Sequence, residues 1–151
     1  PEVANYDSFK AACDAYFHNS HRGEGRGIGG IFFDYLTKDP EQTFAFVQAA
    51  GAAFSAAYLP ILDKNAPLPW TAEQRNWQTH RRGRYVEFNL IHDRGTTFGL
   101  KTGGRTESIL MSMPPVVRWS YQHQATPGSP EAALIEALKA PQDWLSRGSS
   151  R

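Results

Sequence analysis

The sequence contains a single cysteine, Cys13, among 151 residues. One cysteine excludes an internal disulfide and fits a protein that stays in a reducing compartment. An excess of one sign of charge is also absent, because 16 lysines and arginines stand against 15 aspartates and glutamates, for a formal net charge of +1. This balance gives no support for a polyanion-binding surface over the whole protein. Nucleic acid is therefore not an expected partner.

Long apolar runs, repeats and low-complexity segments are lacking as well. No apolar run approaches the roughly 20 residues needed to cross a bilayer, and no signal peptide is visible. A membrane span is therefore not expected, and the cytoplasm is the expected location. What the chain does have is 40% hydrophobic and 13% aromatic residues, a globular composition. Its length predicts a single domain over residues 1–151.

Four segments carry helix signals. Apolar residues recur at helical spacing in Tyr6–His18. Asp39-Pro40 with Gln42 combines an N-cap, a proline at the first position and a capping-box partner, and the stripe Phe44, Val47, Gly51, Phe54 and Tyr58 follows. Thr71 with Gln74 predicts the start of a third helix, and Ser129-Pro130 predicts the start of a C-terminal one.

Strand signals are concentrated between these helices. Alternation predicts a strand at Tyr85–Ile91, and further strands are predicted at 28–33, 96–100, 107–113 and 116–121. Turns are predicted at Asp93–Gly95, where Asp bonds forward to the backbone, and at Thr102–Arg105. Short turns between consecutive strands favour an antiparallel sheet. The expected fold class is α+β with a largely antiparallel sheet.

The turn Gly103-Gly104-Arg105 is the best candidate for a binding site. Two residues without side chains let a ligand approach the backbone, and the guanidinium beside them matches a carboxylate. The alternative is a simple hairpin turn in which Arg105 pairs with a nearby acid such as Glu107.

Two other motifs resemble binding sites for a dinucleotide and for nucleic acid, but neither interpretation is favoured. Gly25-x-Gly27-x-x-Gly30 spells a dinucleotide fingerprint, but a helix precedes it and a strand is expected after it, which is the reverse of the required order. A nicotinamide or flavin cofactor is therefore not expected. The basic run Arg81-Arg82-Gly83-Arg84 is more typical of a solvated or internally paired face than of a nucleic-acid site.

Three long strings, in this order, carry a resemblance to a known family. They are HRGEGRGIGGIFFDYL (21–36), RRGRYVEFNLIHDRGTTFGLKTGGRTESILMSMPPVVRW (81–119) and SPEAAL (129–134), followed by Asp143-Trp144. The chain closely resembles the C-terminal half of the oxygen-dependent coproporphyrinogen III oxidases. The resemblance implies conversion of two propionates of coproporphyrinogen III to vinyl groups, with molecular oxygen as co-substrate, no organic cofactor, carbon dioxide as by-product and protoporphyrinogen IX as product. It also implies a broad antiparallel sheet flanked by helices on both faces, and a homodimer with contacts around Tyr85–Trp119.

Two strings of the family are absent from this chain, His-x-Asn-x-Arg and Gly-Gly-Gly-x-Asp-Leu. They supply much of the substrate contact and proton transfer in the family. We therefore expect the chain to be a C-terminal part of the enzyme, with the catalytic residues in a missing N-terminal half. The alternative function is a catalytically inactive fragment that binds substrate and dimerises.

The resemblance also assigns residues. Gly103, Gly104 and Arg105 are expected to hold a substrate propionate, and Arg26 is expected to do the same, against a solvated loop arginine as the alternative. A divalent metal is disputed for the family, with His21 as the candidate ligand here; a structural or substrate-adjacent His21 is the favoured interpretation. Asp34 is followed by Tyr35 where the family usually has a second Asp, so a two-carboxylate role at this position is in doubt.

Overall fold

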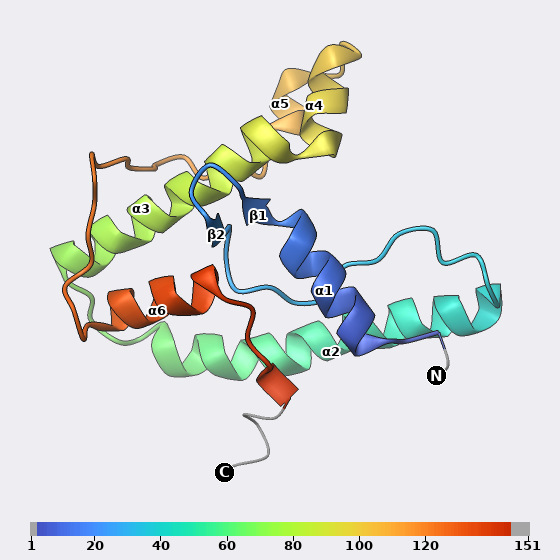
Figure 1. Ribbon diagram of the computed structural model, residues 1–151. Coiled ribbons are helices and arrows are strands. Elements are labelled where there is room, and N and C mark those ends of the chain that lie inside the picture. Colours follow the sequence, from blue (N-terminus) through green and yellow to red (C-terminus); the bar gives the residue numbers. More distant parts are fainter. Residues whose placement is uncertain (1–2, 146–151) are drawn as a thin grey trace. The chain divides into compact units, whose positions relative to one another are not determined.

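The computed structural model describes residues 3–145, and its contacts divide the chain into two compact units. The first contains residues up to Cys13 together with 30–71, and the second contains 14–29 together with the chain from Ala72 onward. The division falls within helix α1 (Tyr6–Tyr16), after Cys13. Figure 1 labels the elements and colours the chain from the N-terminus (blue) to the C-terminus (red). Each unit is described by itself.

The first unit is organised around three phenylalanine rings. Phe9 of α1 lies with its ring centroid 4.9 Å from that of Phe33 and 5.8 Å from that of Phe46. Phe46 belongs to α2 (Pro40–Asn65), the longest helix of the chain (Figure 1). The predicted start of α2 is confirmed: the Asp39 carboxylate accepts a hydrogen bond from the Gln42 N–H at 3.0 Å.

The predicted apolar stripe of α2 is exposed rather than buried. Phe44 and Phe54 are 64% and 66% exposed, and no described residue of α2 is buried. By length and composition α2 is apolar enough to cross a membrane, which corrects the statement that no segment approaches that length. Gln48, Ser55 and Pro60 interrupt the apolar pattern of this helix, although it carries no charge from Phe44 to Leu62. Core helices of soluble proteins have the same length and composition, so these two properties alone do not assign a membrane span to α2.

The second unit has a small core between a hairpin and a helix. The strands β1 (His18–Asn19) and β2 (Glu24–Gly25) pair antiparallel, with His18 opposite Gly25. The rings of Tyr16, Phe17 and Phe88 meet at centroid distances of 4.9 to 5.7 Å, and Phe88 is only 1% exposed. Its remaining helices are α3 (Ala72–Glu87), the π-helical turn η1 (Phe88–His92), α4 (Arg94–Lys101), α5 (Thr106–Ile109) and α6 (Pro130–Lys139).

The strand predicted at Tyr85–Ile91 is wrong, because α3 continues through Glu87 and passes directly into η1. The alternation of Val86, Phe88 and Leu90 does not describe burial, since Phe88 is buried while Leu90 is 50% exposed. The side chain of Asn89 donates to the Tyr85 carbonyl at 2.8 Å, and the Asp93 N–H donates to the Phe88 carbonyl at 2.9 Å. The second of these spans five residues, which is the π-helical pattern.

The other predicted strands are also replaced. Asp93 bonds forward to the Thr96 N–H at 2.7 Å as predicted, but the bond caps α4 instead of closing a hairpin. Part of the segment 107–113 forms α5, and the segments 28–33 and 116–121, both among the described residues, contain no strand. The Thr102–Arg105 turn is confirmed and joins α4 to α5, with Gly103 at φ +73°.

The expected α+β fold with a largely antiparallel sheet therefore overestimated the strand content and underestimated the helix content. Residues 3–145 are mostly helical, and the β1–β2 pair is the only sheet among them. That pair is antiparallel as predicted. The four predicted helices are present, including the C-terminal one, where the Ser129 hydroxyl accepts from the Ala132 N–H at 3.2 Å. The start signals at Asp39 and Ser129 each correspond to a short-range capping hydrogen bond.

Candidate functional site

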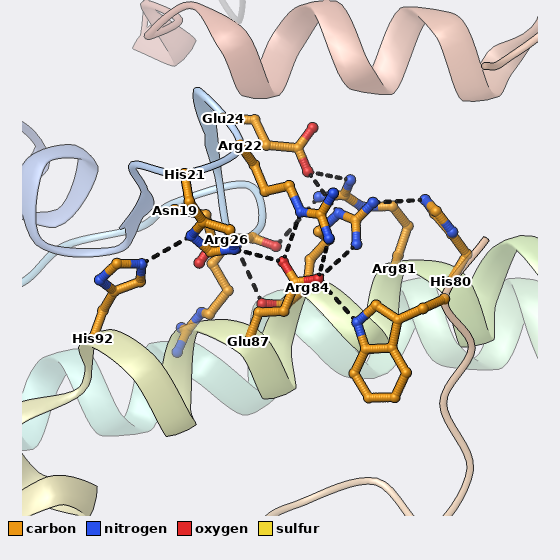
Figure 2. A network of polar contacts seen from close by, with 11 residues as sticks. Asn19, His21, Arg22, Glu24, Arg26, His80, Arg81, Arg84, Glu87 and His92 are labelled. Carbon is orange, nitrogen blue, oxygen red and sulfur yellow. Dashed lines mark hydrogen bonds and ion pairs between the residues drawn. The ribbon is translucent and has the colours of Figure 1, made fainter. Parts of the chain in front are cut away.

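Glu87, the last residue of α3, is the acceptor at the centre of a buried polar network. Its carboxylate receives hydrogen bonds from Arg22 at 2.6 and 3.0 Å, His21 at 3.0 Å, Arg84 at 3.0 Å and the Trp119 indole N–H at 2.9 Å. We call these five residues the Glu87 cluster. Figure 2 shows Arg22 and Arg84 pointing toward Glu87, from the hairpin and from α3. All five belong to the second unit.

The cluster holds Glu87 in its charged form. Burial raises the pKa of the Glu87 carboxyl, but the hydrogen bonds from Arg22 and His21 and the charge of Arg84 outweigh it and hold the pKa at about 2. The same contact raises the pKa of Arg22 through its hydrogen bond to Glu87. A carboxylate that is ionised and fully hydrogen-bonded organises structure and is poorly suited to exchange protons near neutral pH.

The hydrogen bonds determine how neutral His21 carries its proton. A carboxylate only accepts, so the Nε2 atom of His21 donates to Glu87. The Nδ1 atom then accepts from His92 Nε2, 3.1 Å away. The chain of donors therefore runs from His92 through His21 to Glu87.

A second carboxylate, Glu24 of β2, extends the network along α3. Its Oε1 atom lies 2.7 Å from Nη1 of Arg81 and 3.3 Å from Nε of Arg84. Burial lowers the pKa of Arg84, against the opposing charges of Glu87 and Glu24. Arg84 sits between the two carboxylates because it stands one α-helical turn before Glu87, on the same face.

His80 closes the network at the other end, as Figure 2 shows. Arg84 Nη2 is a donor and lies 3.2 Å from His80 Nε2, so that nitrogen accepts and neutral His80 carries its proton on Nδ1. Burial, assisted by the charge of Arg84, lowers the pKa of His80 to about 4. Its Nδ1 atom is buried without a hydrogen-bond partner among the described residues.

The predicted binding turn, Gly103–Arg105, is exposed and lies between α4 and α5. A Cβ at Gly104 would lie 3.0 Å from the Gly99 carbonyl oxygen, and Gly103 has positive φ, so both positions favour glycine. The alternative pairing of Arg105 with Glu107 does not occur among the described ion pairs. The guanidinium of Arg105 therefore stays available for an anion.

Arg26, the other predicted propionate contact, lies over aromatic rings. Its guanidinium carbon is 4.3 Å from the ring centroid of Phe17, 5.0 Å from that of Tyr85 and 5.1 Å from that of Phe88. Stacking of this kind stabilises a guanidinium by about 0.5–2 kcal/mol depending on its hydration. Arg26 is therefore packed against the small core of the second unit, and no described contact joins it to the turn at Gly103–Arg105.

The arrangement around His21 does not fit a metal ion. Both of its ring nitrogens are engaged, by Glu87 and by His92, and the cation Arg22 shares the same carboxylate. Among the described residues no group of three His, Cys, Asp or Glu side chains gathers in a metal-binding geometry. Asp34 and Tyr35 are both exposed, with Tyr35 at φ +54°.

The comparison with known families decides the assignment. A family model described as coproporphyrinogen III oxidase matches residues 2–144, nearly the whole chain. The chain belongs to the coproporphyrinogen III oxidase family. Membership in the coproporphyrinogen III oxidases indicates an oxidoreductase of porphyrin and haem biosynthesis, with coproporphyrinogen III as substrate. The Glu87 cluster joins two of the strings on which the resemblance rests, 21–36 and 81–119.

Sequence analysis of this oxidase family member missed the cluster itself. The sequence patterns assign no role to Arg22 or Glu87, whereas the internal pairing expected as one alternative for the basic run is confirmed at Arg81 and Arg84. A signal did exist: Glu87 is a lone acid within the apolar string Tyr85–Leu90, and a buried carboxylate requires cations. The sequence does not indicate which cation pairs with Glu87, because Arg22 is 65 positions away.

Proposed function

We propose that this chain contributes to the oxygen-dependent oxidative decarboxylation of coproporphyrinogen III. In this reaction two propionates become vinyl groups, giving protoporphyrinogen IX, and each releases carbon dioxide while its electrons pass to oxygen. The family match over residues 2–144 is the observation that carries the proposal. The reduced tetrapyrrole is itself electron-rich, so no organic cofactor is invoked, and no step is assigned to a metal.

In this proposal Arg105 anchors a propionate of the substrate. Its guanidinium is exposed and has no partner among the described residues, and Gly103, two residues before it, leaves open space beside the backbone. A planar fork of donors binds a carboxylate bidentately, which a lysine does not. Arg26 is proposed as a second anchor on the same family grounds; its stacked position favours a role in shaping the core of the second unit. His21 is proposed as a positioning residue for Glu87.

The test is turnover by the purified chain. Coproporphyrinogen III is supplied with and without oxygen, and the porphyrin products are separated and quantified after oxidation. Oxygen-dependent formation of protoporphyrinogen IX supports the full activity. Saturable substrate binding without product supports the alternative, a binding and dimerisation fragment whose catalytic residues lie elsewhere. Neither binding nor turnover contradicts both.

Arg105→Ala separates anchoring from chemistry. We expect KM to rise by roughly tenfold or more while kcat changes less, because the lost contact is a charge-assisted hydrogen bond made in both ground and transition states. Arg75→Ala is the matched control, since Arg75 is also exposed and its side chain donates to the neighbouring Gln78. If the chain turns out to bind without turnover, the same comparison is made on Kd. An unchanged KM or Kd contradicts the assignment.

We also propose a homodimer in the cytoplasm, with contacts around Tyr85–Trp119. This segment exposes several large apolar side chains, which a partner subunit would cover: Leu90, Ile91, Phe98, Leu100, Met111, Val116 and Trp119. Sedimentation or light scattering of the purified chain reports its mass. Phe98→Ser, at a position 69% exposed, is expected to shift a dimer toward monomer, and a monomeric wild-type protein contradicts the proposal.

A further inference from the structure

Helix α2 carries an apolar stripe that the described part of the chain leaves exposed (Figure 1). Its members follow one another at alternating intervals of three and four residues, and they are Phe44, Val47, Gly51, Phe54, Tyr58 and Ile61. Such a spacing is the heptad pattern by which two helices pack along a shared seam. An exposed apolar surface of this extent marks an interaction site. The pattern therefore indicates that the missing cover is another helix.

A lipid bilayer is a poorer occupant of the stripe. Phe46 of α2 lies outside the stripe, and its ring packs against those of Phe9 and Phe33, at centroid distances of 5.8 and 5.3 Å. A helix that crosses a bilayer would have to give up this contact. A helix that lies on a bilayer surface carries lysine and arginine beside its apolar face, whereas α2 has no charged residue from Phe44 to Leu62.

The side chains of the stripe are complementary in size when two copies of α2 run antiparallel. The facing residues of the two copies are then Phe44 with Ile61, Val47 with Tyr58, and Gly51 with Phe54. Each aromatic ring faces an aliphatic side chain or a glycine. The ring of Phe54 fits over Gly51, where an added Cβ meets nothing within 4 Å. A parallel pair in register would instead place Gly51 on Gly51 and Phe54 on Phe54, with a void next to a crowded layer.

The flanks and ends of α2 also suit close antiparallel packing. The positions beside the stripe are uncharged and mostly small, namely Thr43, Gln48, Ala50, Ser55 and Ala57. Antiparallel packing brings the helix end that carries Glu41 beside the end that carries Lys64, so the two macrodipoles oppose each other.

The area of the stripe sets the strength of the contact. Its five side chains beyond glycine are between 46% and 66% exposed. Because an aromatic side chain offers about 150–250 Å², they would bury roughly 500 Å² on each copy and about 1,000 Å² in total, the lower limit for a specific interface. Association is therefore expected at high protein concentration, with a Kd on the order of 100 μM.

We propose that α2 pairs antiparallel with α2 of a second copy of this chain, with Phe54 of each copy packed over Gly51 of the other. The contact lies in the first unit, whereas the segment Tyr85–Trp119 belongs to the second unit. It does not rest on the proposed function, and it adds a second self-contact that forms only in concentrated solution. Two different two-fold contacts in one chain assemble dimers into tetramers.

Charge substitutions on two sides of α2 test the contact. The mass of the full chain is measured by light scattering from about 1 μM to about 1 mM, a range that brackets the expected Kd. Wild type is expected to double its mass over this range, whatever its mass in dilute solution, and Phe98→Ser is expected to do the same. Phe54→Glu buries a carboxylate in both central layers, so its mass stays constant. Ala56→Glu, an exposed position outside the stripe, is the control and doubles like wild type.

Circular dichroism verifies that each variant keeps its helix content. A constant mass of the wild type, or a doubling in Phe54→Glu, overturns the proposal. Co-flotation of the wild type with phosphatidylcholine vesicles also overturns it, because a bilayer then covers the stripe. These outcomes are independent of the Tyr85–Trp119 contact, which is measured by the mass in dilute solution.

Cysteine cross-linking tests the direction of the helices. Val47→Cys and Tyr58→Cys, mixed one to one and oxidised, are expected to form a disulfide-linked dimer because these positions face each other. Either variant alone is expected to form none, since like positions in the antiparallel pair are about 16 Å apart along the axis. The wild type, whose single Cys13 is buried, is the control. Cross-linking of Val47→Cys alone, or none in the mixture, overturns the antiparallel pair.

Discussion

Arg22 and Glu87 are joined by two hydrogen bonds, from Nη2 to Oε1 at 2.6 Å and from Nε to Oε2 at 3.0 Å. This is the bidentate geometry in which a guanidinium and a carboxylate match best. The pair links the turn between β1 and β2 to the C-terminal end of α3. The Glu87 carboxylate also accepts hydrogen bonds from Arg84, His21 and Trp119. Its negative charge therefore stabilises all four donors of the cluster.

Removing the charge of Glu87 is expected to destabilise the protein strongly. Glu87→Gln leaves Arg22 and Arg84 without their shared anion, and breaking a buried pair in this way costs about 3–5 kcal/mol. Urea unfolding monitored by circular dichroism measures the change in the free energy of unfolding. Glu107→Gln is the control, because Glu107 is exposed and is expected to change stability by less than about 0.5 kcal/mol. Similar effects of the two substitutions contradict a structural role for the cluster.

Stability is expected to fall in two steps as the pH is lowered. The pKa of His80 is lowered from 6.5 to about 4, so the unfolded chain binds a proton first, and up to about 3 kcal/mol is lost between pH 6.5 and 4. The pKa of Glu87 is lowered from 4.5 to about 2, so its contribution is present above pH 4.5 and is lost as the pH falls toward 2.

His80→Gln separates the two steps. The variant lacks the group that titrates first, so its stability is expected to be flat from pH 6.5 down to about 4.5 and then to fall with Glu87. The measurement is the free energy of unfolding from urea curves at half-unit pH intervals. His18→Gln, a histidine in β1, is expected to keep the wild-type profile. A wild-type decline in His80→Gln shows that another group is responsible.

Local signals predicted helices well in this chain and strands poorly. The start of α2 depends on Asp39 and Gln42, and the start of α6 depends on Ser129, so both are contained within a few residues. The alternation at Tyr85–Ile91 has no such local anchor. There the same residues fit a helix, because helical spacing places Arg84 and Glu87 on one side and buries Phe88.

The same distinction between local and long-range signals applies to the candidate site. The Gly103–Arg105 turn was recognised because glycine and arginine each have a strong individual signature, and the turn is present with Gly103 at positive φ. The Glu87 cluster depends on the contacts of Glu87 with His21 and Arg22, which are 66 and 65 positions away and which no local pattern encodes. The broad sheet with helices on both faces, the single domain and the dimer contact are implied by the resemblance or the length, and they stay predictions.

Gly83 and Gly51 form a matched pair for testing the packing of the segment around Arg118. A Cβ at Gly83 would lie 2.8 Å from the Arg118 carbonyl oxygen, so Gly83→Ala is expected to displace that segment and cost about 1–3 kcal/mol. A Cβ at Gly51 meets nothing within 4 Å in α2, so Gly51→Ala is expected to add up to about 1 kcal/mol through helix propensity. Thermal unfolding of the two variants gives opposite shifts of Tm. Shifts of the same sign contradict the close contact at Gly83.

The indole of Trp119 donates its hydrogen bond to the same Oε1 atom that Arg22 and Arg84 contact. Trp119→Phe keeps an aromatic ring but removes the donor, so we expect a loss of about 1–2 kcal/mol. Because one of the donors to the carboxylate is gone, the pKa of Glu87 is also expected to rise, which moves its acid transition to higher pH. Trp70→Phe, at a position 71% exposed, is expected to be close to neutral. Unfolding is followed by far-ultraviolet circular dichroism, since removing a tryptophan changes the fluorescence. A loss of stability without any movement of the acid transition shows that Trp119 acts by packing against Gly83 alone.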